Sequence, residues 1–222
     1  MVNVAIGIPT IGILNWRFAA DLMALQMPGN VKVIWQVRSM IATARNTIVE
    51  NALEDKDITH ILMIDDDMTF KPDMLIKMLS HDVDIIGALA FKRTDTFAPC
   101  TYMAKDGRLF PIIPEKMMKV SAVGSAGLLV RREVYEKIDY PWFETYYNEE
   151  GRLTSVDIDF CNKARRAGFD IYVDPDIEMG HIGEPPVITR QQFLEKNYDN
   201  IKLRQNLNSD DDNGERGTGS SS

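Results

Sequence analysis

Residues 61–68 read Ile61-Leu62-Met63-Ile64-Asp65-Asp66-Asp67-Met68, an apolar run that ends abruptly in three carboxylates. Four apolar residues in a row are typical of a strand that is buried on both faces, as in a parallel sheet. Because side chains alternate along an extended chain, we expect Asp65 and Asp67 to point one way and Asp66 the other. At the carboxyl end of a parallel strand, Asp65 and Asp67 would face the crevice where open α/β sheets bind ligands.

Two carboxylates on the same side of a chain favour a divalent cation. At a separation of about 4 Å their repulsion is roughly 1 kcal/mol in water and roughly 4 kcal/mol at an effective dielectric constant of 20. Mg²⁺ and Mn²⁺ prefer oxygen ligands, and Mg²⁺ commonly takes one or two carboxylates together with water and substrate phosphates. The alternative is an acidic turn that caps the following helix. We favour the cation site, because the acidic run follows a buried strand.

On both sides of this motif, strand-like and helix-like segments alternate. This pattern predicts a single α/β domain over residues 1–187, with a mostly parallel, mixed sheet flanked by helices. Between about residues 99 and 130, short segments punctuated by Pro and Gly predict antiparallel strands at an edge of that sheet. We expect the other strands at residues 2–8, where Pro9 ends the strand, 31–37, 84–91 and 171–173, and helices at residues 16–25, 42–53, 72–79, 131–138 and 157–167.

The C-terminal part of the chain has a different character. Residues 188–207 carry Leu194, Tyr198 and Ile201 on one predicted helical face, which indicates an amphipathic helix that docks either on its own domain or on a partner surface. Residues 208–222 are acidic and then rich in Gly and Ser, which predicts a disordered tail.

Composition limits the classes of function. The 222 residues include 25 Lys and Arg and 33 Asp and Glu, and the resulting net charge of −8 argues against a nucleic-acid partner. The two cysteines, Cys100 and Cys161, lie far apart in the sequence, which is simplest to explain by a reduced, cytoplasmic setting. No run approaches the roughly 20 apolar residues of a membrane span.

Several short motifs occur in an order that resembles the GT-A-fold glycosyltransferases that use nucleotide-sugar donors, especially the family-2-like enzymes. The resemblance covers roughly residues 4–184, and each piece alone is common by chance, but their order and spacing together match. The pieces are Ile8-Pro9-Thr10, Ala44-Arg45-Asn46, the acidic run, Gly124-Ser125-Ala126-Gly127-Leu128-Leu129-Val130, Asp157-Ile158-Asp159-Phe160 and Met179-Gly180-His181.

For the metal centre, the resemblance implies that Asp65 and Asp67 hold Mn²⁺ or Mg²⁺ against the donor diphosphate, with His181 as a third protein ligand. A neutral imidazole suits Mn²⁺ better than Mg²⁺, which favours manganese. The flanking Gly180 and Gly183 predict that His181 lies on a mobile loop, and the alternative is an ordinary, partly buried histidine.

For the donor, the resemblance implies a UDP- or GDP-sugar held by residues at two strand ends and on one helix: Pro9, Thr10, Arg45, Asp65 and Asp66. The guanidinium of Arg45 matches phosphate oxygens in a fork, although an arginine on an exposed helix face is an equally good explanation. Arg93, just after a predicted strand, is a second candidate for the diphosphate. The aromatic ring of Trp142 is a candidate surface for sugar rings.

For the chemistry, the resemblance implies that Asp157 deprotonates the acceptor hydroxyl. The family commonly has a Glu-Asp pair at this point, whereas this chain has Val156-Asp157, so the first carboxylate is lost. Asp157 also fits an ordinary N-terminal helix charge. The change leaves the stereochemistry of transfer open and admits a non-catalytic nucleotide- or carbohydrate-binding relative.

The nearest enzymatic alternative is a sugar nucleotidyltransferase, which normally has basic residues in a Gly-rich loop after its first strand. Here no Lys or Arg follows that strand before Arg17. The sequence therefore predicts a metal-dependent glycosyltransferase; its acceptor and oligomeric state stay open.

Overall fold

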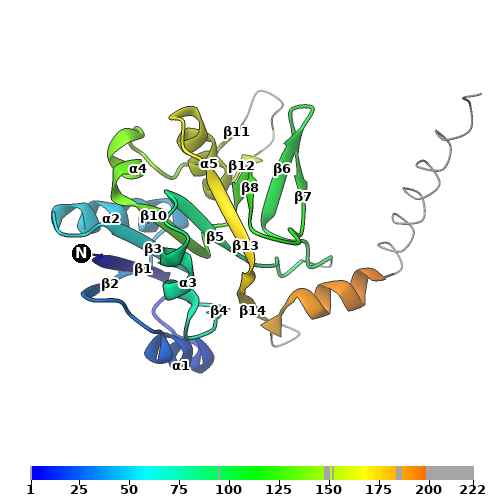
Figure 1. Ribbon diagram of the computed structural model, residues 1–222, viewed down its shortest axis with the longest axis horizontal. Coiled ribbons are helices and arrows are strands. Elements are labelled where there is room, and N and C mark those ends of the chain that lie inside the picture. Colours follow the sequence, from blue (N-terminus) through cyan, green and yellow to red (C-terminus); the bar gives the residue numbers. More distant parts are fainter. Residues whose placement is uncertain (1, 95, 148–150, 152, 184–186, 199–222) are drawn as a thin grey trace, which may run out of the picture.

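The computed structural model describes residues 2–94, 96–147, 151, 153–183 and 187–198. Its centre is a seven-stranded sheet with the order β2-β1-β3-β10-β5-β13-β8 (Figure 1). In this order, β10 and β8 run antiparallel to their neighbours, whereas the other pairs in the sheet are parallel. The strands are β1 (Val4–Thr10), β2 (Val31–Val37), β3 (His60–Ile64), β5 (Ile85–Leu89), β8 (Met118–Val120), β10 (Gly127–Arg131) and β13 (Ile171–Glu178).

Helices cover both faces of the sheet, so the predicted α/β architecture is confirmed. Helices α1 (Trp16–Ala24) and α3 (Met74–Ser80) pack on one face, and α2 (Ile41–Glu54), α4 (Arg132–Lys137) and α5 (Val156–Arg166) pack on the other (Figure 1). The side chains of β3 alternate between the two resulting apolar clusters, with Ile61 and Met63 in one and Leu62 and Ile64 in the other. This strand is therefore buried on both faces, as its unbroken apolar run predicts.

The prediction that Pro9 ends the first strand is wrong, because β1 continues to Thr10. The carbonyl of Thr10 accepts a hydrogen bond from the backbone N–H of Arg38, on the β2 side, so the nitrogen of Pro9 faces the β3 side. There the pairing with β3 already stops at Gly7. A proline has no N–H to donate, and at this unpaired edge none is needed.

The prediction for residues 99–130 is partly wrong. A separate antiparallel sheet is formed by β6 (Thr101–Lys105), β7 (Arg108–Pro111) and β9 (Ala122–Val123), and β8 does lie at an edge of the central sheet. In contrast, β10 lies in the middle, between β3 and β5, and places Gly127 opposite Ile64. There are two further small sheets. In one, β14 (Gly180–Ile182) lies between β4 (Met68–Thr69) and β15 (Val187–Ile188), and in the other β11 (Tyr146–Tyr147) pairs with β12 (Leu153–Thr154).

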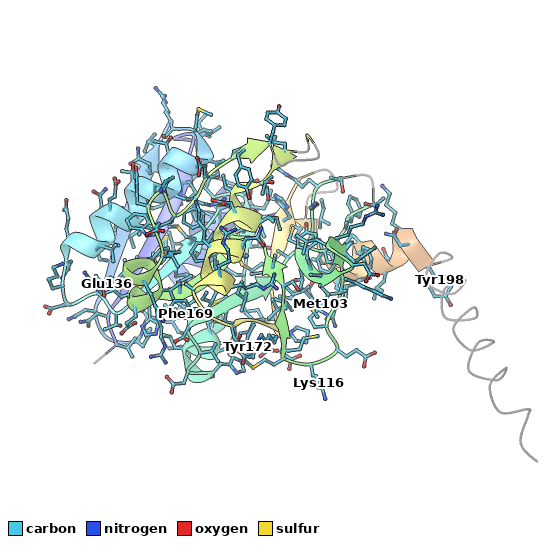
Figure 2. All side chains as sticks on the ribbon, turned by 90° about the horizontal axis from the view of Figure 1, so that it is seen from above. Met103, Lys116, Glu136, Phe169, Tyr172 and Tyr198 are labelled. Atoms are coloured by element: carbon cyan, nitrogen blue, oxygen red, sulfur yellow. The ribbon has the colours of Figure 1, made fainter. Side chains whose placement is uncertain are left out.

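The described part of the C-terminal segment is helical over residues 190–198 and packs on its own domain. Phe193 stacks on Phe91 with ring centroids 5.5 Å apart, and Asn197 donates a hydrogen bond to the carbonyl of Thr96. Figure 2 shows Tyr198 at the outer end of this helix, away from the body of the domain. The rest of the predicted helix and the predicted tail, residues 199–222, lie outside the described residues, and the domain boundary at residue 187 stays a prediction. Among the described helices, none has the length and apolar character needed to cross a bilayer.

Candidate active site

The three carboxylates of the acidic run have separate environments, because the extended chain of β3 stops at Ile64. The backbone N–H of Asp65 bonds to the carbonyl of Ala126, and the chain then turns at Asp66 and Asp67. The strict alternation predicted for the three side chains therefore does not apply, and each one has a different environment. Pro9 and Thr10 end the neighbouring strand β1 at this same edge of the sheet.

Backbone pairing brings Asp67 and His181 together. His181 lies opposite Met68 in the β4–β14 ladder, and the N–H of Ile182 donates to the carbonyl of Asp67 at 2.8 Å. Gly180 permits this close approach, since a Cβ there would lie 2.5 Å from Thr69 Oγ1. His181 is therefore held in a strand, and the prediction of a mobile loop is wrong. Its Nε2 lies 3.2 Å from Asp67 Oδ2.

The other ring nitrogen of His181 identifies the tautomer. Nδ1 lies 2.8 Å from the carbonyl oxygen of Phe91, which can only accept, so Nδ1 carries a proton. In the neutral imidazole Nε2 then presents its lone pair to the Asp67 carboxylate. Two acceptors that face each other need a cation between them, either a proton or a metal ion. A histidine whose second nitrogen is oriented by a carbonyl is the usual arrangement of a metal ligand.

A third group reaches the same carboxylate. Arg93 Nη2 lies 2.8 Å from Asp67 Oδ2, and Arg93 Nη1 donates to the carbonyl of Ile182 at 3.2 Å. Burial alone would raise the pKa of Asp67. With a proton on Nε2, the hydrogen bond and charge of His181, together with the charge of Arg93, lower that pKa below its ordinary value. Asp67 is therefore ionised at neutral pH.

Asp65 has a different partner from Asp67. Arg45 Nη2 lies 3.0 Å from Asp65 Oδ1, and Arg45 Nη1 lies 2.8 Å from Asp157 Oδ1. Arg45 is only 3% exposed, so the alternative of an exposed helix arginine is wrong. Burial opposes the charge of Arg45, yet the two aspartates raise its pKa above the ordinary value. The predicted base thus lies beside the acidic run, joined to it through one buried guanidinium, a link that no local motif indicates.

Asp66 contributes an acceptor without a donor. Its Oδ2 is buried and has no hydrogen-bond partner among the described residues. A buried carboxylate oxygen left in this way is costly unless a ligand satisfies it. This observation is consistent with a hydroxyl or a cation arriving from outside the chain.

These donors fit a hard divalent cation with few protein ligands. Within the described ranges, no group of three or more His, Cys, Asp or Glu side chains is arranged to hold a metal ion. Asp67 and His181 supply one oxygen and one nitrogen, and Mg²⁺ or Mn²⁺ ordinarily completes such a set with water and phosphate oxygens.

Of the aromatic residues before α5, Trp142 lies in the core and Tyr147 lies on the surface. Trp142 is 8% exposed and its Nε1 donates to the carbonyl of Tyr135, so it is a core residue and not the sugar-binding surface predicted for it. Tyr147, on β11, is 73% exposed.

The chain is similar to one known protein family and to several solved structures. Residues 17–206 match the protein family described as Glycosyltransferase like family 2. Among curated protein sequences, none matches the chain significantly.

Two solved structures are similar in fold. A197 from STIV has a TM-score of 0.58 and 16% identity, over 85% of this chain and 94% of A197. GalNAc-T7, solved with UDP, GalNAc and Mn²⁺, has a TM-score of 0.52 and 11% identity, over 81% of this chain and 44% of that one. The chain thus spans less than half of GalNAc-T7. Since the family match extends over most of the chain, the protein belongs to the Glycosyltransferase like family 2 and has the GT-A-like fold that its motifs predict.

Proposed function

We propose that the protein transfers a sugar from a nucleoside-diphosphate sugar to an acceptor hydroxyl in a metal-dependent reaction. The observation that carries this proposal is the pair formed by Asp67 Oδ2 and His181 Nε2, which face each other at 3.2 Å while Nδ1 is held by the carbonyl of Phe91. A proton or a metal ion between the two acceptors completes this pair, and in the proposed reaction it is the metal ion. It lies at the carboxyl end of β3, the edge where open α/β sheets bind their ligands.

Asp67 and His181 are the proposed ligands for Mn²⁺ or Mg²⁺, and Asp65 stays a predicted third ligand. In the structure both oxygens of Asp65 accept from Arg45, so direct ligation by Asp65 requires that it turn away from this guanidinium. When bound, the divalent cation supplies Lewis-acid stabilisation of the charge that develops on the departing nucleoside diphosphate.

Asp157 is the proposed general base. Arg45 holds its Oδ1 at 2.8 Å and thereby orients the carboxylate at the start of α5. The proton of the acceptor hydroxyl passes to Asp157 while the acceptor oxygen bonds to the anomeric carbon. The bond from that carbon to the diphosphate oxygen breaks, and the nucleoside diphosphate leaves. Direct displacement of this kind inverts the anomeric centre.

The proposed donor is a UDP- or GDP-sugar. Pro9 and Thr10, which end β1, are the proposed contacts of its nucleotide, and the buried acceptor oxygen of Asp66 suits a ribose or sugar hydroxyl. The presence of UDP and Mn²⁺ in GalNAc-T7 favours UDP as the first nucleotide to test. The cytoplasmic setting stays a prediction, which the localisation of a tagged protein would check.

Thermal unfolding in the presence of UDP or GDP, with and without Mn²⁺, tests the proposal. We expect the melting temperature to rise most when metal and nucleotide are both present, because each provides ligands for the other. Asp67→Asn should remove the joint effect, whereas Asp157→Asn should keep it and yet stop transfer of the sugar. The matched control is Asp82→Asn, an 88% exposed side chain paired with Arg131. An unchanged joint effect in Asp67→Asn would exclude Asp67 as a ligand.

A further inference from the structure

Two basic side chains, His181 and Arg93, contact the same oxygen of Asp67. Asp67 Oδ2 lies 3.2 Å from His181 Nε2 and 2.8 Å from Arg93 Nη2. The second amino group of the Arg93 fork donates to the carbonyl of Ile182, the residue after His181. Arg93 therefore bridges the two chain segments that carry the proposed metal ligands, and its positive charge rests where the cation would bind.

A guanidinium and a divalent cation cannot both bind one carboxylate oxygen without strong repulsion between like charges. We propose that Arg93 neutralises Asp67 before ligands bind, and that the diphosphate of the nucleotide draws Arg93 away so that the metal ion can bind. Arg93 is thus a diphosphate-binding residue and also the source of the coupling between nucleotide and metal. This inference rests on the proposed function, because it assumes the same metal and diphosphate site.

The environment of Arg93 permits the exchange. Its side chain is 50% exposed, whereas the side chain of Arg45 is 4% exposed and contacts two aspartates. The backbone on either side of Arg93 is anchored. The N–H of Lys92 donates to the carbonyl of Ala98 at 2.9 Å, and the carbonyl of Thr94 accepts from the N–H of Phe97 at 3.0 Å. A long side chain on a fixed backbone can swing between two nearby anions. The planar fork of a guanidinium matches a phosphate as well as it matches a carboxylate.

The exchange predicts that removing the charge of Arg93 has opposite effects on the binding of Mn²⁺ alone and on the binding of UDP. Without nucleotide, Mn²⁺ must displace Arg93 from Asp67, so removal of the Arg93 charge should tighten binding of Mn²⁺ alone. Arg93 also contributes to binding of the diphosphate, so the same substitution should weaken binding of UDP. By linkage, the factor by which Mn²⁺ tightens UDP binding equals the factor by which UDP tightens Mn²⁺ binding. That factor should fall when Arg93 is removed.

The test uses the full chain with the substitution Arg93→Gln. Binding of Mn²⁺ alone is followed through the EPR signal of the free ion, and binding of UDP is followed by calorimetry without Mn²⁺ and at saturating Mn²⁺. For Arg93→Gln we expect Mn²⁺ alone to bind roughly two- to fivefold more tightly, as suits an exposed ion pair. The coupling factor should fall by about fivefold or more.

Two variants make this result specific. Arg131→Gln removes the same charge at the far end of β10, where Arg131 pairs with Asp82 and Asp84, and should leave all three measurements unchanged. Arg93→Lys keeps the charge without the fork and should restore part of the coupling.

The possible outcomes are distinct. If Arg93→Gln weakens binding of Mn²⁺ alone and of UDP together, Arg93 only maintains the shape of the site, and the inference is overturned. It is equally overturned if Arg93→Gln behaves like Arg131→Gln while the wild-type protein binds Mn²⁺ and UDP jointly. If the wild-type protein shows no joint binding, the proposed function fails first, and the inference fails with it.

Discussion

At the scale of single residues, Arg45 neutralises two carboxylates of the site, those of Asp65 and Asp157. Its buried guanidinium stands between the carboxylates of Asp65 and Asp157, which are 27% and 28% exposed. Removing one member of a buried charge pair is strongly destabilising, because the remaining charge has no partner. Here partial hydration of both carboxylates reduces that loss.

We therefore expect Arg45→Met, which keeps the length and removes the charge, to lower the free energy of unfolding by about 2–3 kcal/mol. Arg131→Met is the control, because it removes the same charge from an exposed pair and should cost less than about 1 kcal/mol. Chemical unfolding of both variants gives the comparison. Equal losses would show that Arg45 does not hold the two carboxylates together.

The residue scale also shows what the sequence can and cannot predict about the site. The proximity of Asp67 to His181 was expected, because a family resemblance supplies contacts between residues far apart in sequence. The alternation predicted for Asp65, Asp66 and Asp67 was wrong, because β3 ends with the apolar run at Ile64 and the chain then turns, as in the alternative of an acidic turn. The link from Arg45 to Asp157 joins residues 112 positions apart, and no periodicity along the chain encodes such a contact.

At the scale of secondary-structure elements, the packing of α2 against β1 brings Arg45 of α2 into contact with Asp65. Gly7 makes this close packing possible, because a Cβ there would lie 2.2 Å from Ile48 Cγ2. Gly7→Ala should therefore push α2 away from the sheet and cost about 1–3 kcal/mol.

A double-mutant cycle checks this reason. Ile48→Ala alone should cost about 2–5 kcal/mol by leaving a cavity. The double variant should lose at least about 0.5 kcal/mol less than the sum of the two single losses, since Ile48→Ala removes the clash that Gly7→Ala makes. Additive losses would mean that Gly7 matters for some reason other than its contact with Ile48.

The C-terminal helix also bears on the metal centre. Phe193 stacks on Phe91, and the carbonyl of Phe91 orients His181. Groups that orient a metal ligand commonly affect metal affinity by about 10–100-fold when they are lost. Phe193 acts one step further away, so Phe193→Ala should weaken Mn²⁺ binding in the presence of UDP by roughly 3–10-fold.

Leu194→Ala is the matched control for this helix. Leu194 is the neighbouring residue and is 41% exposed, so its truncation should leave Mn²⁺ affinity unchanged. Both affinities come from the same EPR titration. If the two variants lose equal affinity, the effect belongs to the helix in general and not to the contact between Phe193 and Phe91.

The bounds of helices and strands were predicted best where the hydrophobic periodicity of one segment decides them. The strand β2 has its predicted bounds, and α2 differs by one residue at each end. The position of β10 was missed, because pairing between strands depends on which partners the whole chain makes available. Its unbroken apolar residues Leu128-Leu129-Val130, buried on both faces, were the signal for a central strand.

At the scale of the whole molecule, the site is assembled from segments that are distant in the sequence. The end of β3, the buried face of α2, the start of α5 and the strand β14 meet at one edge of the sheet. A ligand that binds several of these segments stabilises the whole fold, by about 2.7 kcal/mol at a concentration 100 times its dissociation constant. The α/β architecture, with helices on both faces of the sheet, follows in contrast from alternation and hydrophobic patterning. The order of the strands does not, as the central position of β10 shows.

The account depends most on one cation between Asp67 and His181. A crystal structure of the full chain with Mn²⁺ and UDP, with data collected at the manganese absorption edge, tests it directly. We predict one anomalous peak bonded to Asp67 Oδ2, to His181 Nε2 and to oxygens of the diphosphate, with Arg93 turned from Asp67 onto the phosphates. A nucleotide bound at this edge without manganese beside Asp67 and His181, or manganese bound elsewhere, would contradict the account.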